Sequence, residues 1–205
     1  MSSVDIDHKA IHRIWVRQHA ARLAKLIGFL GLIGWFSSVE CLTNWASGSV
    51  AMMPATSLMS LIAGIGVEND SERSAMGVGL FLVISFVLFG YFDFVKLIGS
   101  DYQAVKPGMP SWGTLAVFSM IGCDLLLRNR TWFGWLPVIA FLAASFALFG
   151  HAINQPWMYY YSDSSTAMAI PTASALAACA VGAMCRDSAD KLRCDFRFQN
   201  PGGVR

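Results

Sequence analysis

The chain has 205 residues, of which 55% are hydrophobic and 14% are charged, and its formal net charge is +2. Soluble domains carry roughly 25% charged residues, so this composition argues strongly against a soluble domain. The small net charge argues against nucleic acid as a partner. The charges are segregated along the chain, and windows such as 76–92 and 166–184 contain none. Such windows are typical of membrane-spanning helices.

Residues 1–21 are polar and basic, and they are predicted to form a separate cytoplasmic segment. Within 5–19, Ile11, Ile14 and Trp15 fall on one face at helical spacing, whereas Arg13 and Arg17 fall on others. This pattern predicts a short amphipathic helix lying on the inner membrane surface, with docking to a soluble partner as the alternative. No cleavable signal peptide is evident, so the first span is expected to remain in the mature protein.

The apolar stretches that follow predict an all-α integral membrane protein with about six transmembrane helices. The spans are expected over 22–38, 51–67, 76–98, 110–127, 133–151 and 167–185, within one transmembrane domain over 22–185. Residues 186–205 form a short cytoplasmic tail. Pro54, Pro110 and Pro171 suit the first turn of a helix, where the missing N–H is no loss.

An internal repeat predicts that these spans form three two-helix units. The stretch 85–90, Ser-Phe-Val-Leu-Phe-Gly, returns at 145–150 as Ser-Phe-Ala-Leu-Phe-Gly. Gly34, Gly90 and Gly150 are each followed, about twenty residues later, by a proline that opens a new apolar run. A fixed period of this kind indicates one structural unit used three times.

Lysine and arginine positions predict the orientation. Basic residues precede the first span, lie between spans two and three and between four and five, and follow span six, whereas only Lys96 and Lys106 fall on the other side. The positive-inside rule then places both termini in the cytoplasm and the chain in the inner, or plasma, membrane. Tryptophan and tyrosine at the span ends are typical of the two aromatic belts of a membrane protein.

Ionisable residues near the spans are few, and they predict two ion pairs. Asp93 and Lys96 are three residues apart near the outer end of span three, and Asp124 and Arg128 are four apart at the inner end of span four. Residues at these spacings meet on one helix face. We interpret both as interfacial pairs, because a proton relay would need further carboxylates at mid-depth.

The residue after each repeat glycine is Trp35, Tyr91 and His151 in turn. If the units surround a pseudo-three-fold axis, these side chains lie at one depth and rim a shallow ligand pocket at the outer face. A lipid or a quinone is the expected ligand of such a pocket. Ligation of haem or a pigment by His151 is an alternative, although haem held between two spans usually needs two histidines.

Span six is rich in alanine and glycine, which permits close helix approach at the centre of the bundle or at an oligomer contact. The five cysteines form no CxxC pair, so neither a zinc site nor a disulfide framework is expected. No catalytic motif is recognised, so an enzyme is not expected.

The stretch 50–64 reads Val-Ala-Met-Met-Pro-Ala-Thr-Ser-Leu-Met-Ser-Leu-Ile-Ala-Gly, and 168–176 reads Met-Ala-Ile-Pro-Thr-Ala-Ser-Ala-Leu. Both resemble the Met-x-Pro-x-Thr-Ala pattern of the membrane sensory domains of bacterial sensor histidine kinases and diguanylate cyclases. The resemblance covers roughly residues 22–185 and implies a ligand-sensing membrane domain. The chain departs from that family because no kinase or cyclase output domain follows.

Three functions are therefore weighed. The first is a non-catalytic accessory subunit that packs against other membrane proteins, or copies of itself, in a larger respiratory or photosynthetic assembly. The second is a sensory domain that binds an apolar ligand. The third is a small transporter or channel, although broken helices and polar groups at mid-depth, which mark transport sites, are not evident.

Overall fold

The structure is a computed structural model that describes residues 8–46, 50–69, 71–98, 110–127, 134–159 and 167–186. For residues 8–10, 72 and 89–98 it describes the backbone alone. Within these ranges the chain is helical and contains no β-strand, so the predicted all-α class is confirmed.

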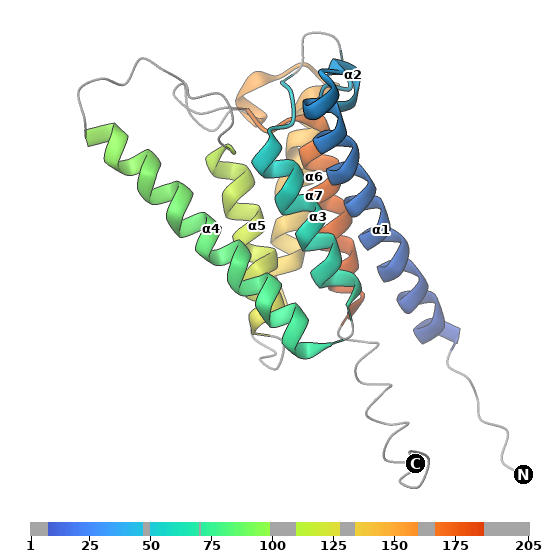
Figure 1. Ribbon diagram of the computed structural model, residues 1–205. Helices are drawn as coiled ribbons and strands as arrows, with labels where there is room; N and C mark the ends of the chain where they lie inside the picture. Colours follow the sequence, from blue (N-terminus) through green and yellow to red (C-terminus); the bar gives the residue numbers. More distant parts are fainter. Residues whose placement is uncertain are drawn as a thin grey trace, which may run out of the picture.

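Seven α-helices and one short 3₁₀ helix make up the described part of the chain (Figure 1). Each of the six apolar stretches predicted from the sequence overlaps one of the longer helices. In chain order the elements are α1 (His8–Ser37), α2 (Glu40–Thr43), α3 (Pro54–Glu68), α4 (Glu72–Ile98), α5 (Trp112–Leu126), α6 (Leu136–Ala152), η2 (Pro156–Met158) and α7 (Ile170–Met184).

Proline and serine fix where several helices begin. Pro54 and Pro171 lie in the first turns of α3 and α7, as predicted, where the fixed φ angle suits helix entry. Pro110 was expected in the same role, but α5 begins at Trp112. Ser111 is the N-cap there, and its hydroxyl accepts a hydrogen bond from the Thr114 backbone N–H at 3.2 Å.

Helix α1 continues across the boundary predicted after residue 21. Helix α1 runs without interruption from His8 to Ser37, so the basic segment is the beginning of the first long helix rather than a separate one. The residues from Arg17 to Ala24 contain no glycine or proline that would break the helix. Ala20, Ala21 and Ala24 are also buried, which carries the packed face of α1 across the expected boundary.

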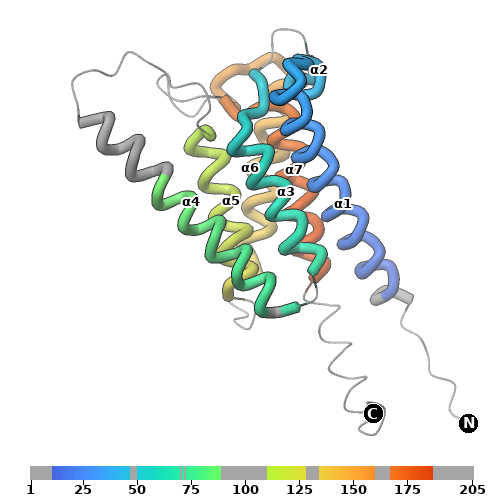
Figure 2. Tube along the Cα trace, in the orientation of Figure 1, coloured from blue at the N-terminus to red at the C-terminus, as the bar shows by residue number. Residues whose placement is uncertain are grey.

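The long helices pack as three pairs that close into a ring. The pairs α1–α3, α4–α5 and α6–α7 match the three predicted two-helix units. Neighbouring pairs meet through α3–α4, α5–α6 and α7–α1, which completes the circle. Helix α7 also contacts α3 and α5 (Figure 2), so the alanine-rich last helix packs at the centre of the bundle.

Small residues fill the interior and large apolar residues cover the outside. Half of the buried apolar side chains are alanines, and Phe118 is the only fully buried phenylalanine among the described residues. Phe36, in contrast, is 89% exposed. Large apolar side chains are exposed on every long helix, among them Leu26, Phe29, Leu58, Ile65, Leu80, Ile84, Trp112, Leu142, Phe146 and Met184.

Glycines let neighbouring helices approach until their backbones touch. A methyl group added at Gly79 of α4 would lie 2.5 Å from the carbonyl oxygen of Gly122 on α5, and one added at Gly122 would lie 2.9 Å from that of Gly79. A methyl group added at Gly28 of α1 would lie 2.6 Å from the carbonyl oxygen of Ser57 on α3. These contacts involve backbone atoms, which cannot rotate away as a side chain can.

One described helix is long and apolar enough to cross a membrane by length and composition. It is Ile11–Ser37 within α1, with a mean hydropathy of 1.3. The other apolar helices, measured over the fully described residues, are 10–17 residues long.

We expect Gly79→Ala to destabilise the bundle by about 1–3 kcal/mol, because the added methyl group forces α4 and α5 apart. Gly77→Ala is a matched control on the same helix, since nothing lies within 4 Å of that position. It should be neutral or stabilise by about 0.5–1 kcal/mol. Thermal unfolding in detergent measures both variants, and equal effects would contradict this account of the α4–α5 contact.

Candidate functional site

Two helices end with the same backbone motif at the end of the bundle that carries α2, called here the α2 end (Figure 1). The carbonyl oxygen of Gly34 in α1 accepts a hydrogen bond from the Val39 N–H at 2.9 Å, and that of Gly150 in α6 accepts one from the Gln155 N–H at 2.8 Å. The residue before each donor has a positive φ, 57° at Ser38 and 52° at Asn154. This is the Schellman motif, which satisfies carbonyls that a helix end leaves open.

The side-chain ring of the residue after each glycine is hydrogen-bonded to the extended segment that leads into the next helix. The indole Nε1 of Trp35 donates to the Met52 carbonyl oxygen at 2.6 Å. The imidazole Nε2 of His151 lies 2.7 Å from the Met168 carbonyl oxygen. A carbonyl can only accept, so Nε2 of His151 carries the proton. Both rings therefore tie the first helix of their unit to the start of the second.

The same two segments make a second matched contact. The Met52 N–H donates to the Thr43 carbonyl oxygen at 2.8 Å, and the Met168 N–H donates to the Tyr159 carbonyl oxygen at 2.9 Å. The glycine, the ring, the positive-φ residue and the methionine recur at one constant spacing in the first and third units. The internal repeat is thus visible as equivalent hydrogen bonds.

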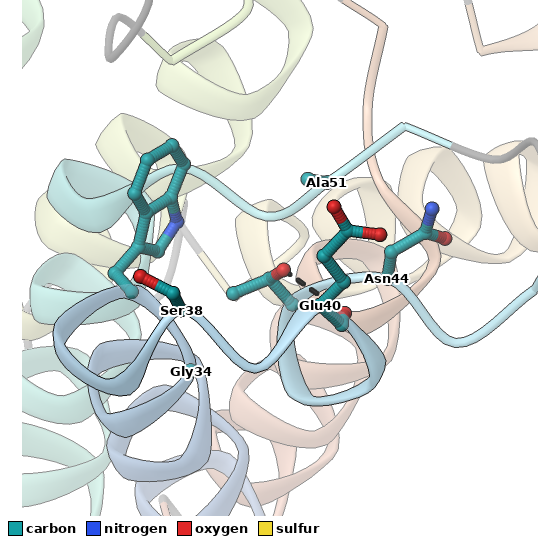
Figure 3. A pocket seen from close by; sticks show the side chains of 7 residues that line it. Gly34, Ser38, Glu40, Asn44 and Ala51 are labelled. Carbon is teal, nitrogen blue, oxygen red and sulfur yellow. Dashed lines mark hydrogen bonds between the residues drawn. The ribbon is translucent and has the colours of Figure 1, made fainter.

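The side chain beside the ring differs between the two units, and a cavity lies beside the ring of the first unit. In the third unit the Tyr159 ring stacks on His151, with 3.8 Å between centroids and 11° between planes. The equivalent residue in the first unit is Thr43, which is too small to cover Trp35. A cavity of about 430 Å³ lies there instead (Figure 3), lined by Gly34, Trp35, Ser38, Glu40, Thr43, Asn44 and Ala51.

Trp35 and His151, which were predicted to rim one ligand pocket, therefore have different surroundings. Trp35 lines the cavity, but His151 does not, because Tyr159 covers one face of its ring and Met168 bonds its edge. The side chain of Tyr91 lies outside the described residues.

The opposite end of the bundle, where α1 begins and α7 finishes, is called here the terminal end, and it holds an ion pair between α1 and α3. The ammonium of Lys25 donates a hydrogen bond to Glu68, and Arg22 lies 3.4 Å from the same carboxylate. The hydrogen bond from Lys25 lowers the pKa of Glu68 below its ordinary value of 4.5; partial burial opposes this, while the charges of Lys25 and Arg22 add to it. Glu68 stays ionised near neutral pH and links the two helices.

Two arginines are buried at this terminal end. Arg186, just after α7, donates from Nη1 to the Gly66 carbonyl oxygen at 3.1 Å and from Nη2 to that of Asn69 at 3.4 Å. These oxygens are at the C-terminal end of α3, where a cation is favourable to the helix dipole. Arg17 of α1 is only 2% exposed.

The ion pairs predicted from spacing are not tested by these contacts. The side chains of Asp93 and Lys96, and the whole of Arg128, lie outside the described residues. Asp124 is partly buried near the end of α5. The Lys25–Glu68 pair was missed because its partners come from different helices, although the position of Glu68 at the inner end of span two, beside basic residues, was a usable signal.

Comparisons with protein families, with curated proteins and with solved structures find no match to this chain.

The pH dependence of stability should reflect Glu68. Its folded-state pKa is lowered, so its contribution is fully present above the unfolded value near 4.5 and is lost as the pH falls through the lower folded value. We expect the difference in melting temperature between the wild type and Glu68→Gln to be largest above pH 5 and to shrink towards pH 3. A difference independent of pH would show that the carboxylate charge contributes nothing.

Proposed function

We propose that this chain is a multi-pass protein of the plasma membrane, with about six spans formed by α1, α3, α4, α5, α6 and α7. The distribution of small and large side chains supports this placement. Alanine and glycine lie between the helices, while many leucine, isoleucine and phenylalanine side chains lie on the outside. Lipid gives no hydrophobic drive for helix association, so small residues at helix contacts are the expected arrangement in a membrane.

The lengths of the shorter helices are compatible with this placement. A helix of 15 residues, such as α3, is about 22 Å long, whereas the hydrocarbon layer is about 30 Å thick. Extended residues lengthen the apolar layer, since Met52 before α3 and Met168 before α7 are fully buried. Their backbone N–H groups are hydrogen-bonded, which is the condition for non-helical backbone at membrane depth.

Charge placement supports cytoplasmic termini. Arg17, Arg22, Lys25 and Arg186 all lie at the terminal end of the bundle, whereas the described residues that line the cavity at the α2 end include Glu40 and no basic residue. The positive-inside rule then assigns the terminal end to the cytoplasm.

Within the membrane we propose a non-catalytic role, in which the protein packs as a subunit against another membrane protein. The observation that carries this proposal is helix α4, whose main contacts with other described helices are with the paired α5 and the neighbouring α3. Its remaining surface is large and apolar, with Met76, Leu80, Ile84, Val87 and Leu88 all exposed. A face this wide suits a helix of a partner as well as it suits lipid.

Photo-crosslinking in native membranes tests this role. A photoreactive phenylalanine analogue at Leu80, Ile84 or Leu88 should crosslink to one partner polypeptide, because these positions recur on one helical face. The same analogue at Leu142 or Phe146 on α6 is the matched control, since both are also exposed. Adducts to lipid alone at all five positions would refute the subunit role while leaving the membrane placement intact.

A second candidate is a membrane sensory domain, and one observation favours it specifically. Helix α1 carries Gly34 and Trp35 of the cavity at one end and Arg17 near the other, without a break between them. A continuous helix is a direct mechanical link across the bundle. The resemblance of 50–64 and 168–176 to bacterial sensory domains supports the same role.

The sensory candidate makes a separate prediction. The variant Thr43→Tyr, which fills the cavity, should change amide hydrogen exchange in the first turns of α1, around residues 11–20. The control Ser37→Ala lies at the end of α1, outside the cavity lining, and should leave that exchange unchanged. Unchanged exchange in Thr43→Tyr would count against signalling along α1.

A further inference from the structure

We propose that the cavity at the α2 end binds an alkylammonium group, which stacks on the indole of Trp35 and pairs with the carboxylate of Glu40. This ligand class goes beyond the packing role, and it would give the sensory candidate its signal. The proposal rests on a comparison of the two repeated units and on the chemistry of the lining.

The third unit shows which side chain occupies the position that corresponds to Thr43. A methyl group added at Gly150 would meet the side chains of Met158 and Tyr159, and one added at Gly34 would meet those of Leu42 and Thr43. The two turns thus make matching contacts. Tyr159 stacks on His151, whereas Thr43, at the equivalent position, lines the cavity beside Trp35. The third unit supplies its own stacking partner, and the first unit leaves that place to a ligand.

The indole of Trp35 is held ready to receive such a group. Its Nε1 is already bonded to the Met52 carbonyl oxygen, so the polar edge of the ring is engaged and the aromatic surface remains for the cavity. Trp35 is 41% exposed even so. The face of an indole attracts ammonium groups more strongly than that of any other side chain.

The opposite wall supplies the negative charge. Figure 3 shows Glu40 and Asn44 side by side on α2 and just after it, with Ser38 on the other side of the cavity. The hydroxyl of Thr43 donates to the Glu40 backbone oxygen at 3.1 Å, which holds the short helix at the cavity wall. No lysine or arginine is among the seven lining residues. The lining therefore favours a cation over an anion.

The counterpart of Glu40 in the third unit is Pro156, which begins η2 and carries no charge. The unit that lacks the covering ring is therefore also the unit that has the carboxylate. A volume of about 430 Å³ lies within the range of small-molecule sites, and it accommodates a choline or ethanolamine group.

Two sources could supply this group: a free amine, or the headgroup of a zwitterionic lipid. The lipid source depends on the proposed membrane placement, because it requires the α2 end to face a headgroup layer. The exposed Trp45 and Trp157 near this end suit that layer. The free-amine source is independent of the membrane placement.

The test uses the full chain in nanodiscs made of phosphatidylglycerol alone, which has no ammonium group. Labelled choline and ethanolamine are titrated in by equilibrium dialysis, and the neutral carbon isostere of choline serves as the uncharged probe. A second preparation contains an equal share of phosphatidylethanolamine, and the lipids that stay with the protein after detergent exchange are quantified by mass spectrometry. Saturable choline or ethanolamine binding supports a free amine, and selective retention of phosphatidylethanolamine supports a lipid headgroup.

The variants Glu40→Gln and Trp35→Leu should each weaken binding by about tenfold or more. Thr43→Tyr should abolish it by placing in the first unit the ring that the third unit already has. Trp45→Leu, which alters an exposed tryptophan outside the lining, should bind as the wild type does. Because Glu40 is exposed, Glu40→Gln should fold normally, and melting temperature checks this.

The proposal is overturned if neither source binds to the wild type, if the neutral isostere binds as tightly as choline, or if the folded Glu40→Gln variant binds as the wild type does. These outcomes are separate from crosslinking at α4, so the subunit role and the ammonium site can fail independently.

Discussion

Close contact between helix backbones is the constraint on which the rest of this structure depends. Gly79 meets the backbone of Gly122, and Gly28 meets that of Ser57, so at these points the paired helices leave no room for a side chain between them. Many leucines, isoleucines and phenylalanines face outward on α1, α3, α4 and α6, whereas Phe118 of α5 and Leu176 of α7 are buried. The resulting molecule has a tight alanine-rich interior and an apolar exterior, which in the proposed membrane setting meets lipid or a partner helix.

With the middle of the bundle occupied by small residues, polar interactions are concentrated at its two ends. At the terminal end, Glu68 and Arg186 tie α3 to α1 and to the segment after α7. At the α2 end, the rings of Trp35 and His151 each bond a methionine carbonyl in their own unit. Helix α1 joins both ends without a break.

The repeated units share one structural plan but differ in local packing. The first and third units share the Schellman turn, the ring after the glycine and the hydrogen bond to the methionine N–H. They differ in the side chain above the ring, which is Tyr159 in one and Thr43 in the other. The larger side chain completes the packing of the third unit, whereas the smaller one leaves a polar cavity beside an exposed tryptophan.

The sequence by itself determined the all-α class, the six apolar helical stretches, the starts of α3 and α7 at prolines and the pairing of helices implied by the repeat, because hydropathy and backbone propensity are local properties. It did not indicate that α1 continues across residue 21, since the burial of Ala20, Ala21 and Ala24 depends on the neighbouring helices. It selected Trp35 and His151, but only the tertiary structure decided that Tyr159 covers one and that Thr43 leaves the other open. Glu68 and Arg186 likewise acquire their roles from partners distant in the sequence, and such contacts exist only after the helices have packed.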